Sequence, residues 1–245
     1  MSRLRGLALC VLLVATAAAA DERAYRAYCA TCHGVLGKGD GPSARWLSSP
    51  PRDFTRGEYR WRTTPTGSLP TDGDILRTIN GGAYGTAMPA WKTRLPLAMR
   101  LSLMRYLKTL SPRFAEEQPE PALSFPAPPE STPELVAAGK AVYERLKCGE
   151  CHGKEGRGDG PAVATMKDSV GRPMVAYDFT KGFYKRGSTP AVIYRTFMTG
   201  LNGTPMPSYE QTTREDERWP LVFYTRSLHR DRGVVDTLFG PLEEQ

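Results

Sequence analysis

The sequence predicts an all-α protein made of two similar domains in tandem. Long stretches recur in the same order in the two halves of the 245 residues, which indicates an internal duplication. Each half begins and ends with a segment whose apolar residues recur at the spacing of an amphipathic helix, and no stretch alternates as a β-strand would. The middle of each half is rich in Gly and Pro, which favours irregular backbone.

The first twenty residues have the features of a secretory signal. Arg3 and Arg5 precede an apolar run from Leu7 to Ala20, which ends in alanines before the polar Asp21. Basic residues, a short apolar run and small residues at its end predict export and cleavage, so residues 1–20 are expected to be a cleaved signal peptide. The alternative is an uncleaved anchor, although the run is shorter than the roughly 18 residues of a spanning helix.

One short pattern occurs in both halves: two cysteines separated by two residues and followed directly by histidine. The two copies are Cys29-Ala-Thr-Cys32-His33 and Cys148-Gly-Glu-Cys151-His152. This pattern is typical of covalent c-type haem attachment, because the thiols can form thioethers to the porphyrin and the histidine can ligate the iron. A zinc site would need four converging ligands, and a redox dithiol would need a βαβ context. We therefore predict two covalently attached c-type haems, with His33 and His152 as iron ligands.

The remaining cysteine and the charge agree with this prediction. Cys10 lies in the expected signal, and the other four cysteines all lie in the two motifs, so none is left for a disulfide. The 33 Lys and Arg exceed the 26 Asp and Glu by 7. Signal cleavage would remove Arg3 and Arg5, and the propionates of two haems would nearly cancel the rest, so the basic composition does not predict nucleic-acid binding.

The duplication extends well beyond the haem motifs. The matching segments are His33–Pro42 with His152–Pro161, Asp53–Tyr59 with Asp178–Tyr184, and Gly85–Trp91 with Gly203–Tyr209. The second copy carries extra residues around 167–174, and the first carries an extra loop at 68–73. Matches that keep their order across such shifts predict two duplicated domains.

A proline-rich segment separates the halves. Pro112 to Pro133 holds seven prolines in 22 residues, which predicts an extended, semi-rigid linker without helix. The expected boundaries are a signal peptide at 1–20, a first domain at 21–111, the linker at 112–133, a second domain at 134–230 and a C-terminal tail at 231–245.

Each domain is expected to hold a helix at either end and a short one between them. Thr132 is placed to cap the first helix of the second domain, with Pro133 in its first turn. The expected helices cover residues 21–28, 74–79 and 95–110 in the first domain and residues 134–146, 192–197 and 219–228 in the second. With so little regular structure, the haem should supply much of the buried apolar surface.

Methionine is the better candidate for the second axial ligand, because its thioether favours ferrous iron. Only Met88 and Met206 occupy equivalent places in both repeats, each in a Gly-Thr-x-Met-Pro turn. The alternative is that both fill space in the core. The spare histidine, His229, lies among arginines and is expected to be exposed.

Together these residues make both halves resemble class I cytochrome c domains, over nearly all of residues 21–230. The resemblance implies that each domain is a few helices wrapped around a covalently bound haem. It also implies that the Pro42 and Pro161 carbonyls accept a hydrogen bond from Nδ1 of the motif histidine. Glu150 in the second motif and the repeated Asp-Phe-Thr segment depart from the minimal family pattern. Candidate propionate partners, with exposed surface charge as the alternative, are Arg56, Arg60, Arg62, Lys181 and Lys185.

The resemblance implies a periplasmic dihaem carrier of single electrons, or the dihaem subunit of a larger respiratory oxidoreductase. Redox proteins, membrane-bound or periplasmic, are the expected partners, and the membrane would be reached only through a partner or an uncleaved signal. The alternative is a dihaem enzyme of the peroxidase or thiosulfate-oxidising type. Such an enzyme needs an open or labile sixth iron position, whereas both halves offer the same Met-Pro turn. We therefore expect an electron-transfer protein with no catalytic residue.

Overall fold

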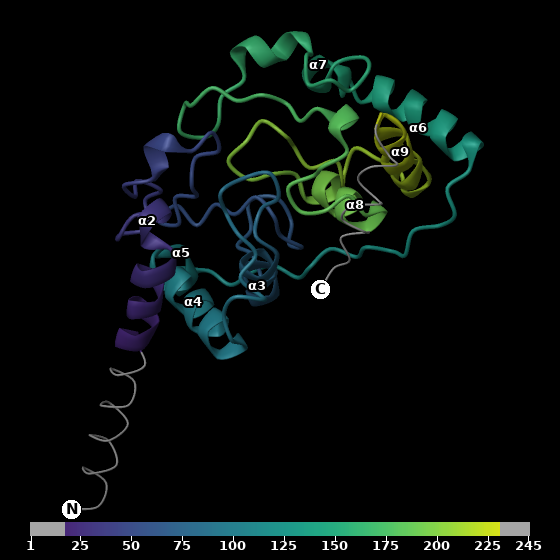
Figure 1. Ribbon diagram of the computed structural model, residues 1–245. Coiled ribbons are helices and arrows are strands. Elements are labelled where there is room, and N and C mark those ends of the chain that lie inside the picture. Colours follow the sequence, from purple (N-terminus) through teal and green to yellow (C-terminus); the bar gives the residue numbers. More distant parts are fainter. Residues whose placement is uncertain (1–17, 231–245) are drawn as a thin grey trace, which may run out of the picture. The chain divides into compact units, whose positions relative to one another are not determined.

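Residues 18–230 are described in the computed structural model of the chain. Most of the expected signal peptide, its residues 1–17, and the expected tail at 231–245 lie outside the described residues. The described part is helical and contains no β-strand, only an isolated bridge between Lys167 and Pro173 (Figure 1). The prediction of an all-α fold is confirmed.

The chain divides into two compact units. Unit 1 comprises the chain up to Tyr59 together with Leu69–Pro119, and unit 2 comprises Arg60–Ser68 together with the chain from Glu120 onward. The segment Arg60–Ser68 lies inside the first repeat in sequence but packs as part of unit 2, which the duplication does not predict.

Unit 1 contains three of the expected helices and three short ones. A helix over residues 18–28 leads into the remaining elements, which are α2 (Ala30–His33), η1 (Ala44–Trp46), α3 (Asp72–Gly81), α4 (Leu97–Thr109) and α5 (Arg113–Glu116). The side chains of Thr71 and Asp74 form a capping box that fixes the start of α3. The expectation of a linker without helix is wrong at α5, because its N-cap is Pro112, and a missing N–H costs nothing at that position.

Unit 2 repeats the same order of long helices. Its elements are α6 (Pro133–Arg145), α7 (Gly149–His152), η2 (Pro161–Thr165), η3 (Phe179–Lys181), α8 (Pro190–Thr199) and α9 (Glu215–Ser227). The predicted cap is confirmed, because the Thr132 hydroxyl accepts a hydrogen bond from the Leu135 N–H at 3.3 Å.

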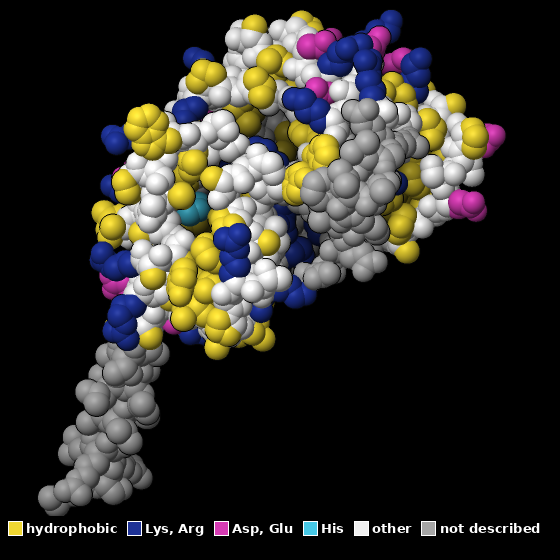
Figure 2. Space-filling model, viewed as in Figure 1, with side chains coloured by type: hydrophobic (Ala, Val, Ile, Leu, Met, Phe, Trp, Pro, Cys, Tyr) yellow, Lys and Arg dark blue, Asp and Glu magenta, His cyan; other side chains and the backbone are white. Residues whose placement is uncertain are grey.

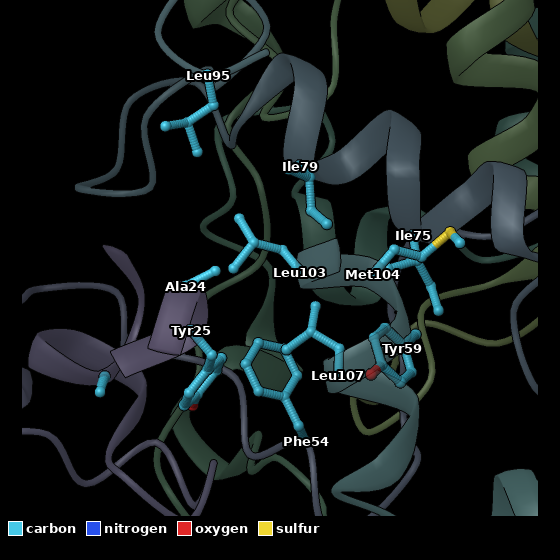
Figure 3. Packing of buried hydrophobic residues seen from close by; sticks show 11 residues of the cluster. Ala24, Tyr25, Phe54, Tyr59, Ile75, Ile79, Leu95, Leu103, Met104 and Leu107 are labelled. Carbon is cyan, nitrogen blue, oxygen red and sulfur yellow. The ribbon is translucent and has the colours of Figure 1, made fainter. Parts of the chain in front are cut away.

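Each unit has its own core, in which the first long helix meets the last. In unit 1, side chains from the first helix, α3 and α4 converge around Leu103 (Figure 3). The ring centroids of Tyr25 and Tyr106 lie 4.8 Å apart. In unit 2 the core is more aromatic, and the ring centroids of Tyr143 in α6 and Tyr224 in α9 lie 5.3 Å apart. This pairing of helices holds the residues that lead into each cysteine motif.

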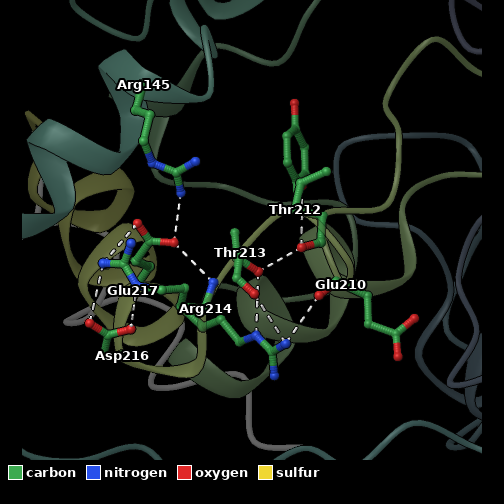
Figure 4. A network of polar contacts seen from close by, with 9 residues as sticks. Arg145, Glu210, Thr212, Thr213, Arg214, Asp216 and Glu217 are labelled. Carbon is green, nitrogen blue, oxygen red and sulfur yellow. Dashed lines mark hydrogen bonds and ion pairs between the residues drawn. The ribbon is translucent and has the colours of Figure 1, made fainter.

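Polar contacts also hold the start of α9 to the end of α6. Arg145 donates to the buried Glu217 carboxylate at 2.6 Å, and the Arg214 backbone N–H donates to the same side chain at 2.9 Å (Figure 4). A buried carboxylate near a helix N-terminus is stabilised both by these donors and by the helix dipole. The beginning of α9 therefore has a fixed position in unit 2.

The surface carries charge of both signs. Acidic and basic side chains are intermingled on the face shown in Figure 2. After α7, Glu155 pairs with Arg157 at 2.6 Å and with Arg230 at 3.2 Å. Across residues 18–230, no helix has both the length and the hydropathy that a membrane span requires.

Candidate haem-attachment sites

The two cysteine motifs fold in the same way. Cys29 is the N-cap of α2 and Cys148 is the N-cap of α7, so each motif forms one helical turn that ends at its histidine. The backbone N–H groups of His33 and His152 bond to the carbonyls of these cysteines at 2.9 Å. Residues three and four positions apart share a helix face, so both thiols and the imidazole project from the same side.

The hydrogen bonds of the two motif histidines decide which ring nitrogen can bind metal. Nδ1 of His33 lies 3.0 Å from the Arg52 carbonyl oxygen, and Nδ1 of His152 lies 2.9 Å from that of Tyr177. A carbonyl only accepts, so Nδ1 carries the proton and Nε2 of the neutral ring keeps its lone pair. Burial lowers the pKa of both histidines, which favours this neutral form.

These acceptors differ from the expected ones. The resemblance placed the bond on the carbonyls of Pro42 and Pro161, but the structure gives it to the residues just before the repeated Asp-Phe-Thr segment. The Gly-Pro segments contact the motifs through the glycines instead. The Gly41 and Gly160 N–H groups donate to the carbonyls of the second cysteine of each motif at 3.1 Å. The Pro42 and Pro161 expectation is therefore corrected.

Local hydrogen bonds explain why the Asp-Phe-Thr segment can supply the acceptor. The Asp53 carboxylate accepts from the Thr55 N–H at 2.9 Å and from its hydroxyl at 2.6 Å, which closes a tight turn. The Phe54 N–H donates to the Gly37 carbonyl at 2.7 Å, in the loop that follows the haem motif. Unit 2 repeats these three bonds with Asp178, Thr180, Phe179 and Gly156.

The phenylalanine of the same segment packs on the histidine ring. The centroids of Phe54 and His33 are 4.4 Å apart at 24°, and those of Phe179 and His152 are 4.4 Å apart at 21°. Stacking and the Nδ1 bond together fix the plane of each imidazole. Sequence reasoning did not assign a role to these phenylalanines, although their recurrence outside the minimal family pattern was the available signal.

A buried tyrosine was missed in the same way. The Tyr25 hydroxyl donates to the Gly34 carbonyl at 2.8 Å, and the Tyr143 hydroxyl donates to the Gly153 carbonyl at 2.7 Å. Each bond joins the first long helix of a unit to the glycine just after the motif histidine. The tyrosines thereby fix the end of the one-turn helix that presents the ligands.

The four motif cysteines are partly buried and form no disulfide with one another. Burial raises the pKa of Cys29 to about 12 and that of Cys148 to about 11, so both stay protonated at neutral pH. Within residues 18–230 no three His, Cys, Asp or Glu side chains converge as metal ligands, whereas a structural zinc site requires four.

The two candidate methionines lie in loops with the same hydrogen bonds. In unit 1 the Ala83 N–H donates to the Met88 carbonyl at 3.0 Å, and the Thr86 hydroxyl donates to the Ala83 carbonyl at 2.7 Å while accepting from the Met88 N–H at 3.1 Å. The equivalent bonds of Leu201, Thr204 and Met206 measure 3.1, 2.8 and 3.2 Å. Met206 packs against the same core as Cys148.

The expectation that His229 is exposed is wrong. It is half-buried in unit 2, and its Nε2 lies 3.2 Å from the Tyr184 hydroxyl oxygen. Tyr184 in turn belongs to the aromatic cluster that includes Phe179. The flanking arginines suggested solvent, but the ring finds a polar partner within the aromatic packing.

The residues present fit one covalently held haem in each unit. Each unit offers two cysteine side chains and a neutral imidazole with an available Nε2 on one helical turn, and a half-buried thioether in a fixed loop. The chemistry that a haem supplies when bound in this way is a one-electron iron couple.

Comparisons with known proteins agree with this geometry. Residues 136–229 match the cytochrome c family, and residues 16–107 match the family of subunit III of cbb3-type cytochrome c oxidase. The chain is also similar to a solved chain of the Kuenenia stuttgartiensis reducing HAO-like protein complex Kustc0457/Kustc0458. The identity is 45%, the TM-score is 0.83, and the match covers 86% of this chain and 96% of that chain. None of the curated proteins compared with the chain matches it.

Proposed function

Because the chain belongs to the c-type cytochromes, with two class I domains in tandem that carry covalently bound haem, we propose that it is the electron-transfer subunit of an exported redox complex. It is a dihaem electron-transfer cytochrome. The observation that carries the proposal is that the same hydrogen bonds position the candidate iron ligands in both units. Neither site therefore differs from the other in a way that would suit catalysis.

We assign the haem contacts by residue. The residues that would hold the haem through thioethers and iron ligation are Cys29, Cys32, His33 and Met88 in unit 1 and Cys148, Cys151, His152 and Met206 in unit 2. The one-turn helix and the methionine loop of each unit support this assignment. Hydrogen bonds within the protein hold both backbones, so their conformation does not depend on a bound haem.

These residues keep the ligands in place when the charge on the iron changes. The backbone carbonyl on Nδ1 and the stacked phenylalanine hold each imidazole, and the Gly-Thr-x-Met-Pro turn holds each sulfur. An uncharged thioether favours the ferrous state and raises the reduction potential. Small movement of the ligands between oxidation states suits rapid transfer of single electrons.

A protein partner is supported by the similarity to a chain taken from a complex and by the surface beside α2. Large apolar side chains are unusually exposed there, at Tyr28 (41%), Val35 (45%), Leu36 (64%) and Trp46 (75%). The positions of unit 2 aligned with Val35, Leu36 and Trp46 carry Lys154, Glu155 and Thr165. Exposed apolar residues of this kind mark interaction surfaces, so we place the docking of a redox partner at unit 1. The signal-like residues 1–20 support a periplasmic location.

Redox titration of the ligand variants tests the proposal. Met88→His and Met206→His are each expected to lower one of two midpoint potentials and leave the other unchanged, because imidazole replaces the thioether at a single iron. Met99→His, at a methionine without a counterpart in the other repeat, is the matched control and should change neither potential. The ligand assignment is wrong if neither ligand variant lowers a potential. A high-spin signal from one haem of the unaltered protein would favour the enzyme alternative.

A further inference from the structure

Arg62 is one of the most deeply buried charged side chains in unit 2. Only 1% of its surface is exposed, so it is not surface charge. Its guanidinium donates to the Thr199 carbonyl at 2.6 Å and approaches the Gly200 carbonyl at 3.5 Å. Thr199 ends α8 and Gly200 is its C-cap, where helix carbonyls lack intrahelical partners and a cation is favoured. Nε also donates to the Pro65 carbonyl at 3.1 Å, which shapes the segment that carries the arginine.

Two neighbours of Arg62 bond to the same part of unit 2. The Thr66 hydroxyl donates to the Thr199 carbonyl at 2.6 Å, and the Gly67 N–H donates to the Asn202 side-chain oxygen at 3.1 Å. The segment Arg60–Ser68 is therefore attached to unit 2 between the end of α8 and Asn202.

The insertion around residues 167–174 supplies another support. The Ser169 N–H donates to the Gly203 carbonyl at 3.2 Å. The Asp168 carboxylate accepts from the Val170 and Arg172 N–H groups at 3.0 and 2.9 Å, which gives the insertion a fixed turn. The supported positions thus run from Thr199 to Gly203.

These positions are the last residue of α8 and the start of the loop that leads to Met206. The Leu201 N–H bonds to the Met206 carbonyl at 3.1 Å, so a shift at the end of α8 is passed to the methionine through one bond. The supports are not duplicated in sequence. The first repeat lacks the insertion, and Gly187 stands where the second repeat aligns with Arg62.

We propose that Arg62 is a positioning residue for Met206. With Thr66 and Ser169 it holds the loop from Thr199 to Met206, so that the sulfur of unit 2 resists displacement by an external ligand. The inference rests on the proposed function, because it takes Met206 as an axial ligand.

Imidazole binding to the oxidised holoprotein tests this inference. In a Met88→His background, only the haem of unit 2 retains a methionine-to-iron charge-transfer band, so its loss reports displacement of Met206. Arg62→Ala is expected to raise the imidazole affinity of this haem about tenfold, since a hydrogen bond to a charged group contributes roughly that much. In a Met206→His background, the same substitution should leave displacement of Met88 unchanged.

Three further variants separate position from charge and from folding. Arg62→Lys keeps the charge but loses the planar guanidinium, so it should raise the imidazole affinity less than Arg62→Ala does. Thr66→Val removes one bond to Thr199 and the hydroxyl that accepts from the Arg62 guanidinium, without removing charge, and should raise the affinity by a smaller factor. Arg26→Ala is the matched control, because it changes the net charge equally at an exposed pair with Glu22.

The outcomes distinguish this inference from the proposed function. An unchanged affinity in Arg62→Ala and Thr66→Val, with the charge-transfer band present, overturns the positioning role and leaves the ligand assignment standing. An equal rise at both haems means general loosening and also overturns it. Absence of the band in the Met88→His protein removes Met206 as a ligand, and the inference fails with that assignment. If Arg62→Ala does not fold, Thr66→Val decides alone.

Discussion

At the scale of single residues, a backbone carbonyl decides which nitrogen of each motif histidine is available. The acceptors are Arg52 in unit 1 and Tyr177 in unit 2, whose side chains have nothing in common. Their carbonyls are equivalent because the turn that follows each of them is closed by an aspartate. Substitution of either acceptor's side chain therefore leaves the hydrogen bond in place, whereas substitution of Asp53 or Asp178 removes what positions it.

Asp21 links residue chemistry to acid stability in unit 1. Burial alone would raise the pKa of this carboxyl, but hydrogen bonds from Arg105, at 2.9 and 2.8 Å, and from Ser102 outweigh burial and lower it. A carboxyl with a lowered folded pKa stabilises the fold above its unfolded pKa of about 3.9, and that stability is lost as pH falls through the folded pKa. The Asp21–Arg105 pair therefore stabilises unit 1 at neutral pH, and this stabilisation is lost in acid.

Asp21→Asn is expected to lower the free energy of unfolding by about 1 kcal/mol at neutral pH, a value discounted because Arg105 is half exposed. The difference from the unaltered protein should shrink below about pH 4. Urea unfolding of the holoprotein from neutral pH to about pH 3 measures it. Asp72→Asn, at an exposed pair with Lys108, is the control and should change little. A deficit that persists undiminished in acid would contradict the argument.

Side-chain chemistry was predictable from the sequence, and backbone chemistry was not. The chemistry of thiols, imidazoles and thioethers follows directly from the residue type. The duplication then distinguishes Met88 and Met206 from the other six of the eight methionines. The carbonyls of Arg52 and Tyr177 have no such signature. The burial of Arg62 was also hidden, because the repeat places it in the first domain and only tertiary packing assigns it to unit 2.

At the scale of helices, the two units make the same crossing with different residues. In unit 2, a Cβ atom at Gly139 of α6 would lie 1.9 Å from the Pro220 carbonyl oxygen of α9, so the two backbones touch. The aligned residues of unit 1 are Asp21 and Ser102, which meet through a hydrogen bond between side chains. At this crossing, unit 2 therefore has a close contact between two helix backbones where unit 1 has a hydrogen bond between side chains.

Gly139→Ala is expected to lower the free energy of unfolding of the holoprotein by about 3 kcal/mol or more, because overpacking adds to the displacement of two helices. Gly149→Ala is the matched control. Its Cβ would meet no atom closer than 3.7 Å, and Ala30 already stands at that place in unit 1. The control should be neutral or slightly stabilising in urea unfolding. Equal losses in both variants would mean that helix contact is not the cause.

Helix positions followed from amphipathic spacing, and helix ends followed from capping. Expected segments 74–79 and 95–110 fall on α3 and α4. The expected start at Trp219 was late, because α9 begins at Glu215, where three acidic residues favour the first turn and Glu217 caps it. Pro220 lies inside α9, where it cannot donate an intrahelical hydrogen bond.

At the scale of the whole molecule, each unit has a small core beside its motif. The core of unit 2 is largely aromatic and includes Tyr143, Tyr194 and Trp219, with Cys148 and Met206 packed at its edge. A domain of this size with few helices buries little apolar surface of its own. The prosthetic group that Cys148 and Met206 border would then contribute a large part of the stability of unit 2, independently of unit 1.

Replacement of Cys148 and Cys151 by Ser together tests this independence. The exported protein should retain one haem by mass, because the motif of unit 1 is untouched. Loss of an apolar group comparable to a large buried side chain removes at least about 2 kcal/mol, which lowers the Tm of a domain of this size by about 8–16 °C. Limited proteolysis should cut unit 2 first, while the charge-transfer band of the Met88 haem persists. The reciprocal Cys29→Ser, Cys32→Ser variant should reverse the pattern. Equal loss of protection in both units would show that each haem stabilises more than the unit that binds it.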